Sequence, residues 1–198
     1  MPLASSIDGG LYTWVARLAQ HSPAALDSAV RAWSDYGLSL FALLMLVSWW
    51  RSRSASPART AMALCAPLAV VAAFLVNDLV KSFFHEQRPC RTLHVVTVEA
   101  CPALGDWSFP SNHAAIAAAA ATAIWLTDRR LGAIAIPAAV LMAASRVWIG
   151  VHYPHDVLIG LVTGALVAWP LMVAARRGGP AAVVRLRKSP LRPLVTVR

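Results

Sequence analysis

The sequence alternates long apolar runs with short polar segments. Five runs of mostly aliphatic residues cover Tyr36–Trp50, Ala61–Val80, Ala114–Thr127, Leu131–Ile149 and Val157–Ala175. A membrane-spanning helix needs about 17–25 largely apolar residues, a length that the second, fourth and fifth runs reach. The first and third runs are shorter, so we expect them to extend into Trp33–Asp35 and Phe109–His113. The pattern predicts an all-α, polytopic membrane helical bundle.

The N-terminal stretch has a different pattern. Leu11, Trp14 and Leu18 recur at helical spacing, and a second apolar-patterned piece follows at Ala24–Trp33. This stretch is too polar to span easily, so we predict interfacial helices, with a sixth span as the alternative. The fold would then have five to six transmembrane helices. We expect an N-terminal interfacial segment (1–35), a bundle (36–175) and a basic tail (176–198). The first ten residues lack a basic stretch, so no cleavable signal peptide is expected.

Composition supports a membrane protein. Hydrophobic residues make up 58% of the chain and charged residues only 14%, against about 25% charged in soluble domains. A net charge of +9 could indicate nucleic-acid binding. The arginines, however, lie in short stretches between apolar runs, as in polytopic membrane proteins. We therefore expect a lipid bilayer and no nucleic acid as partners; no oligomeric state follows from the pattern.

The positions of the arginines predict the orientation. Basic residues gather between the first and second runs, between the third and fourth, and after the fifth: Arg51, Arg53, Arg59, Arg129, Arg130, Arg176, Arg177, Arg185, Arg187, Lys188, Arg192 and Arg198. These segments alternate correctly for one side of the membrane, which the positive-inside rule makes cytoplasmic. Residues 81–108 and 150–155 then face outward, and the C-terminus lies in the cytoplasm of a cell-membrane protein.

Most other ionisable residues gather at the outward ends of the runs. The cationic members are Lys81, Arg88 and Arg146. One such residue could snorkel to the surface, but several converging on one face indicate a functional cavity. Asp78 can pair with Lys81, yet too few carboxylates are present to neutralise the set. An excess of guanidinium groups favours a phosphate ligand.

The segment that opens the third run suits the same ligand. Ser111, Asn112 and His113 follow Pro110 at an expected helix start, where free backbone N–H groups and the helix dipole favour an anion. The run Ala114–Ala123 that follows is almost entirely alanine, which favours close helix packing.

Two histidines supply candidate chemistry. His152 lies between Gly150, which can end one helix, and Pro154, which suits the start of the next. Asp156, one turn on, can accept a proton from one ring nitrogen and leave the other free to attack. His113 supplies a separate acid. A metal site is the competing reading, but cations beside a divalent ion repel it, so we expect no metal and no cofactor. His155 is expected to point elsewhere and receives no role.

Three short motifs resemble those of one family. Lys81-x6-Arg88-Pro89, Pro110-Ser111-Asn112-His113 and Ser145-Arg146-x5-His152-x3-Asp156 are similar to the three signatures of the type-2 phosphatidic-acid phosphatase superfamily. The resemblance covers Lys81 to Asp156, in the family's order. It implies a helical bundle with an extracytoplasmic site that needs no metal. Each motif alone is moderately specific, and the three together are strong.

The resemblance also implies residue roles. His152 would be the nucleophile, Asp156 would orient it, and His113 would protonate the leaving group and later activate water. Lys81, Arg88, Ser111 and Arg146 would hold the phosphoryl oxygens.

One position departs from the family pattern: Asn112 replaces a glycine and places a side chain at the pocket rim. An amide or acidic residue here is a feature of bacterial members that act on undecaprenyl diphosphate. The resemblance therefore favours a polyprenyl diphosphate phosphatase that recycles the carrier lipid of cell-wall synthesis.

Other functions remain alternatives. Within the enzymes these are a phosphatase for phosphatidate or phosphatidylglycerol phosphate, a lipid phosphotransferase, and a vanadate-dependent haloperoxidase, which the apolar runs disfavour. A transporter would carry polar residues through the membrane depth, whereas the middles of these runs are Ala, Val, Leu and Ile.

Two of the three cysteines lie in the outward segment. Cys90 and Cys101 would face an oxidising compartment, so we hypothesise a disulfide; two free thiols are the alternative. Cys65 lies within a run and is expected to be a small core residue.

Overall fold

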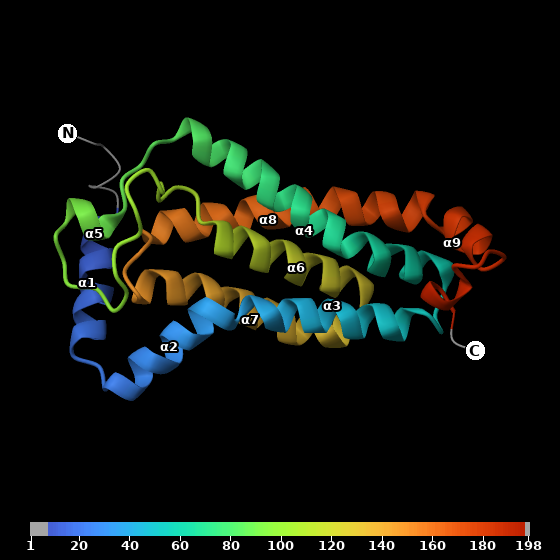
Figure 1. The fold of residues 1–198 in the computed structure, drawn as a ribbon, viewed down its shortest axis with the longest axis horizontal. Helices are drawn as coiled ribbons and strands as arrows, with labels where there is room; N and C mark the ends of the chain where they lie inside the picture. Colours follow the sequence, from blue (N-terminus) through green and yellow to red (C-terminus); the bar gives the residue numbers. More distant parts are fainter. Residues whose placement is uncertain (1–7, 197–198) are drawn as a thin grey trace.

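The computed structural model describes residues 8–196, so part of the region considered for a signal peptide, and Arg198 of the basic tail, lie outside it. Every regular element of the described residues is a helix, as predicted (Figure 1). The helices are α1 (Gly9–Gln20), α2 (Ala24–Tyr36), α3 (Leu38–Ser52), α4 (Pro57–Phe83), α5 (Pro89–Thr92), α6 (Asn112–Thr127), α7 (Arg129–Trp148), α8 (Pro154–Gly178), α9 (Pro180–Leu186) and the 3-10 helix η2 (Arg192–Leu194).

The alanine-rich helix α6 forms the centre of the bundle. It lies among α3, α4, α7 and α8 (Figure 1), and most of its residues are buried. Alanine side chains let the surrounding helices approach closely. On α8, a Cβ atom added at Gly164 would clash with the carbonyl oxygen of Ala115, and one at Gly160 would clash with that of Ser111. The start of α6 therefore lies directly against the backbone of α8 at Gly160 and Gly164.

The helices differ in their capacity to cross a membrane. α4, α7 and α8, with 27, 20 and 25 residues, are long and apolar enough. α2 and α3 meet at a bend of 50° and qualify together as one broken span, which brings the number to up to four. α6 has only 16 residues. The prediction of five to six spans remains a prediction.

The outer surface of the bundle is apolar. Large aliphatic side chains stay exposed along the long helices: Leu43, Leu46, Leu68, Leu75, Val140, Leu141, Leu158 and Leu166. With alanine inside and leucine outside, the described helices have the polarity expected of a bundle in lipid.

The two ends of the bundle carry different segments (Figure 1). One end holds α1, α5 and the turn between α7 and α8; the other holds the α3–α4 turn, the α6–α7 turn and α9. The predicted basic segments thus share one end, and the predicted outward segments share the other. In Figure 1, α1 runs across the first end instead of along the bundle. Its assignment to the membrane interface remains a prediction.

The segment between α4 and α6 is fastened to the end that holds α1. Cys90 and Cys101 form a disulfide, with Cα atoms 5.9 Å apart, which confirms the hypothesis. Glu99 N donates to Ile149 O at 3.2 Å. Gly150, which ends the fourth run as predicted, has a φ of 92°, and a Cβ there would meet Thr97. This segment therefore packs directly on the turn that carries His152. Cys65 is a half-buried free cysteine in α4.

Candidate active site

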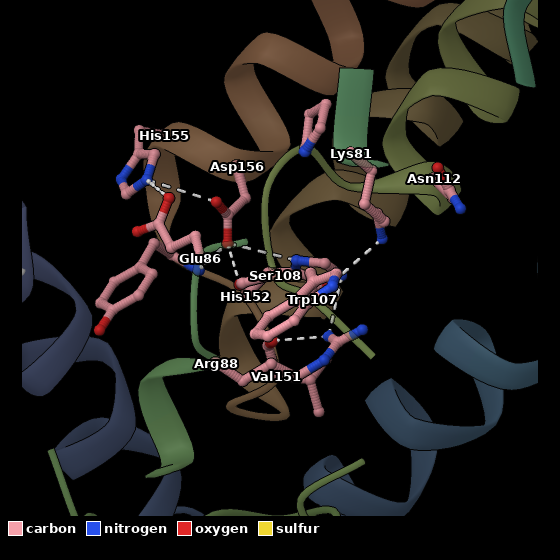
Figure 2. Close-up of polar contacts among 12 residues, drawn as sticks. Lys81, Glu86, Arg88, Trp107, Ser108, Asn112, Val151, His152, His155 and Asp156 are labelled. Atoms are coloured by element: carbon pink, nitrogen blue, oxygen red, sulfur yellow. Dashed lines mark hydrogen bonds and ion pairs between the residues drawn. The ribbon is translucent and has the colours of Figure 1, made fainter. Parts of the chain in front are cut away.

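His152 and Asp156 form a buried pair at the start of α8. Asp156 is fully buried, and its Oδ2 accepts hydrogen bonds from Tyr153 N at 2.8 Å, His152 Nδ1 at 3.3 Å and Ser108 Oγ. Pro154 begins the helix, so Asp156 occupies the third position of the first turn, where a carboxylate reaches back to free N–H groups. Figure 2 shows Asp156 at the centre of these contacts.

The partners of His152 decide which ring nitrogen holds the proton. Nε2 lies 3.2 Å from Arg88 Nη1, which can only donate. Nε2 must therefore accept, and the proton lies on Nδ1, facing Asp156. The pKa of His152 is lowered to about 4, mainly by burial. The positive charges of Arg88 and Arg146 also lower the pKa, whereas Asp156 acts to raise it. The ring is neutral at physiological pH, with its lone pair on the side away from Asp156.

Arg88 is held rigidly next to this lone pair. Its side chain is 5% exposed. Nη1 also donates to Val151 O at 2.8 Å, while Nε and Nη2 donate to the backbone oxygen and Oδ1 of Asp106, each at 2.9 Å. Burial would raise the pKa of Asp106, but the hydrogen bond and charge of Arg88 outweigh it and the pKa is lowered.

Two further cations approach the site from the long helices. Lys81, in the last turn of α4, has Nζ 3.2 Å from Trp107 O. Arg146, near the end of α7, donates from Nη1 to Ser34 Oγ of α2 at 2.7 Å, and its buried Nε has no hydrogen-bond partner in the described chain. Both side chains therefore retain donors for an anion.

The start of α6 contributes the second motif. Ser111 is fully buried; its N–H donates to Asp156 O at 3.1 Å, and its Oγ has no hydrogen-bond partner among the described residues. The half-buried His113 lies in the first turn of α6. The first N–H groups of the helix, including those of Asn112 and His113, have no acceptor within the helix and can bind an anion.

The side chain of Asn112 takes part in a different contact. Its Oδ1 accepts from Asn77 Nδ2 at 2.6 Å, and its Nδ2 donates to Asp78 Oδ1 at 3.3 Å. In Figure 2 it lies apart from the His152 group. The expected pair of Asp78 with Lys81 is not among the ion pairs of residues 8–196, where Asp78 contacts Asn112 instead. Asn112 thus joins α6 to α4, and what it offers a phosphate is its backbone N–H.

Sequence reasoning missed several polar partners of the site. His155 does not point elsewhere: its Nε2 lies 3.3 Å from Asp156 Oδ1 and 3.2 Å from Glu86 Oε2, and its Nδ1 lies 3.0 Å from Asp8 Oδ1. Ser108 and Asp106 come from the irregular segment between α4 and α6, after the Cys90–Cys101 disulfide. Only His155 had a usable signal, because it directly precedes the motif residue Asp156 in the first turn of α8.

One group of side chains has metal-ligand geometry. The donor atoms of Glu86, His155 and Asp156 all lie within 4.8 Å of one another. Because His155 already bridges the two carboxylates, the protein's own contacts account for this arrangement. The expected absence of a metal remains a prediction.

The fold and the site define a class: a helical membrane protein whose buried His–Asp pair and surrounding cations suit phosphoryl transfer. The chain belongs to the PAP2 superfamily, whose family model matches residues 61–179. This agrees with the resemblance of the three motifs, and the chain is accordingly a lipid phosphatase of the membrane.

Individual relatives refine this picture. Undecaprenyl-diphosphatase BcrC of Bacillus subtilis (strain 168) is 30% identical over 151 residues, which cover 75% of this chain and 75% of that protein. Decaprenylphosphoryl-5-phosphoribose phosphatase of Mycobacterium tuberculosis is 36% identical over 115 residues, or 57% of this chain and 61% of that one. The crystal structure of Aquifex aeolicus LpxE has a TM-score of 0.67 at 23% identity and covers 85% of this chain and 96% of the other. The last likeness concerns the fold alone.

Proposed function

We propose that this protein hydrolyses a polyprenyl diphosphate, such as undecaprenyl diphosphate, to the monophosphate, and so recycles the carrier lipid of cell-wall synthesis. The similarity to BcrC over most of both chains supports this substrate. The observation that carries the chemistry is the pair of contacts of His152, whose Nδ1 faces Asp156 and whose Nε2 faces Arg88.

In the first step, Nε2 of His152 attacks the terminal phosphorus. A P–N bond forms as the P–O bond to the polyprenyl monophosphate breaks. His113, which holds a proton once the anionic substrate offsets the neighbouring cations, gives that proton to the departing oxygen. The Nδ1 proton stays in its hydrogen bond to Asp156, which stabilises the positive charge on the ring. The product of this step is a phosphohistidine.

In the second step, His113 takes a proton from water as the water oxygen attacks the phosphohistidine. The P–N bond breaks, inorganic phosphate leaves and His152 regains its lone pair. Lys81, Arg88 and Arg146, with Ser111 and the Asn112 N–H at the start of α6, bind the phosphoryl oxygens and stabilise the charge that grows in the transition state. No step requires a metal ion.

An apolar groove supports a lipid substrate. A cavity of about 280 Å³ lies between Val30 and Trp33 of α2 and Leu141, Ser145 and Trp148 of α7. Arg146 donates to Ser34 of α2, the residue after the groove-lining Trp33, so the groove lies beside the cationic group. We assign it to the part of the polyprenyl chain next to the diphosphate. The arginine-rich end would be cytoplasmic, so the site would open to the extracytoplasmic face.

The test is phosphate release by the detergent-purified protein with excess chelator. Four substrates are compared: undecaprenyl diphosphate, phosphatidate, phosphatidylglycerol phosphate and decaprenylphosphoryl-5-phosphoribose. We expect undecaprenyl diphosphate to have the highest kcat/KM, with activity that survives chelation and is lost in His152→Ala. His21→Ala, an exposed histidine far from the site in sequence, is the matched control and should keep full activity.

The outcomes separate the parts of the proposal. Loss of activity on chelation, with restoration by a divalent ion, would refute metal independence. Faster release from decaprenylphosphoryl-5-phosphoribose would favour the second candidate function, a phosphatase for a phosphosugar on a polyprenyl phosphate, which the 36% identity over 115 residues supports. Faster release from phosphatidate or phosphatidylglycerol phosphate would identify a glycerolipid phosphatase.

A further inference from the structure

A second polar cavity lies at the end of the bundle opposite His152. Its volume is about 660 Å³, and it is lined by the ends of α3, α6 and α8 and by the starts of α4 and α7. Five arginines from four separate helices line it: Arg51, Arg59, Arg129, Arg130 and Arg176. We propose that this cavity binds the phosphate group of an anionic ligand, either a lipid headgroup or a free phosphate compound. The proposal does not depend on the proposed reaction.

The cavity is organised by a buried carboxylate. Asp128 is 3% exposed and caps α7, with Oδ1 accepting from Arg130 N at 3.1 Å. Its Oδ2 lies 2.9 Å from Arg51 Nε and 2.6 Å from Arg59 Nη2. Asp128 therefore holds these two guanidinium groups at the wall of the cavity, while their side chains stay partly exposed. The buried Nε of Arg59 has no hydrogen-bond partner within residues 8–196.

The charge of the cavity is unbalanced. Asp128 is the one carboxylate in its lining, against the five arginines. Arg129, Arg130 and Arg176 belong to no ion pair in the described chain, and Arg129 stacks on Trp125 at 5.0 Å from the ring centre. The N-terminal turns of α4 and α7, two long helices, also line the cavity and add their partial positive charge.

The arginines and the size of the cavity indicate which kind of ligand it can bind. Guanidinium groups bind phosphate oxygens in pairs, and several of them around one cavity match a group with several oxygens. A volume of about 660 Å³ is in the range of sites for whole small molecules. The cavity therefore has room for a phosphate carried on a larger headgroup.

The experiment measures binding of soluble short-chain phosphatidylglycerol to the purified full-length protein, with short-chain phosphatidylcholine as the neutral control. The test variant is Arg130→Gln/Arg176→Gln, which leaves the Asp128 pairs intact. The matched control is Arg177→Gln/Arg192→Gln, which removes two charges at the same end from residues outside the lining. We expect the Kd for phosphatidylglycerol to rise at least tenfold in the test variant and less than twofold in the control.

Inorganic phosphate distinguishes the two sources of the ligand. Displacement of phosphatidylglycerol by millimolar phosphate would identify a site for free phosphate compounds, and saturable binding that resists phosphate would identify a lipid headgroup site. Equal losses in the two double variants, or equal binding of phosphatidylglycerol and phosphatidylcholine, would overturn the proposal. Arg176→Gln alone, at an exposed position, serves if the double variant unfolds, and should weaken binding at least threefold.

Discussion

At the scale of single residues, the ring of His152 is fixed from both sides, by Asp156 at Nδ1 and by Arg88 at Nε2. The sequence predicts the contact between His152 and Asp156. The spacing of four residues across a helix start was enough to place it, because Pro154 begins α8 and puts Asp156 in the first turn, within reach of His152. Ser108 and Asp106 could not be foreseen, since they come from an irregular segment whose path depends on long-range packing.

Activity should be lost at acid pH, because His152 can attack phosphorus only while its ring is neutral. Below a pKa of about 4, Nε2 is protonated and has no lone pair; above it, the ring is neutral and can attack. We expect kcat/KM to fall tenfold per pH unit below about pH 4 and to be independent of this group above it, since kcat/KM reports groups of the free enzyme. The measurement is phosphate release from pH 3 to 7, with activity recovered after return to pH 7. An acid limb near pH 6.5 would contradict the inferred burial of His152.

His113 is expected to act in both chemical steps. His113→Asn should lower kcat by about 10²–10⁴-fold, the usual effect of losing a general acid or base. Phosphatidate, whose alkoxide leaving group needs a proton, should be affected more than an aryl phosphate with an acidic leaving group. A measured loss that is equal for both substrates would argue against His113 as the acid.

His155 is expected to position Asp156. His155→Gln should lower kcat about tenfold, equivalent to about 1.4 kcal/mol, with little change in KM, because Asp156 Oδ1 loses its neighbour while the phosphate ligands stay in place. His155→Asn has a shorter side chain that reaches less far towards Asp156, so it should retain less activity than His155→Gln. Steady-state kinetics on both variants, with His21→Gln as the control, test this role. A change confined to KM would place His155 in substrate binding.

At the scale of helices, the contact between α6 and α8 joins two motifs, because Gly164 lets α8 lie against the backbone of Ala115. The apolar runs predicted the long helices because their composition leaves few alternatives in a membrane. The sequence predicts a boundary at residues 35–36, next to the break at Gly37. The 50° bend between α2 and α3 was not predicted, since it depends on packing: a Cβ at Gly37 would meet the side chain of Met142.

The close contact of α8 predicts a stability difference between two glycines. Gly164→Ala should destabilise the protein by about 1–3 kcal/mol through overpacking and lower the Tm by at least about 2–4 °C. Gly178→Ala, in the same helix with nothing within 4 Å of its added Cβ, should leave the Tm unchanged or raise it slightly. Thermal unfolding in detergent compares the two. A Gly164 variant as stable as the Gly178 variant would show that α8 can move outward freely.

At the scale of the whole molecule, the basic turns and the site occupy opposite ends of one bundle (Figure 1). The count of charges along the sequence predicted this separation, because successive spans reverse direction. The cavity around Asp128 was not predicted, since its five arginines converge only when four helices are assembled.

The proposed orientation predicts which positions reagents reach in intact cells. In a Cys65→Ser background, Leu104→Cys (79% exposed) should react with a membrane-impermeant maleimide added outside. Leu191→Cys (53% exposed) should react only after permeabilisation. Labelling in the reverse order would invert the orientation and place the site in the cytoplasm.

The enclosure of α6 also limits how this protein can diverge. Nearly every position from Ala114 to Ala123 is buried against another helix, so substitutions there are restricted to the smallest side chains. Leu68 and Leu75 on the outer face of α4 are exposed and can exchange with any apolar residue. Over evolutionary time, the middle of this chain should therefore change slowly while its lipid-facing surface drifts, even though neither region takes part in the chemistry.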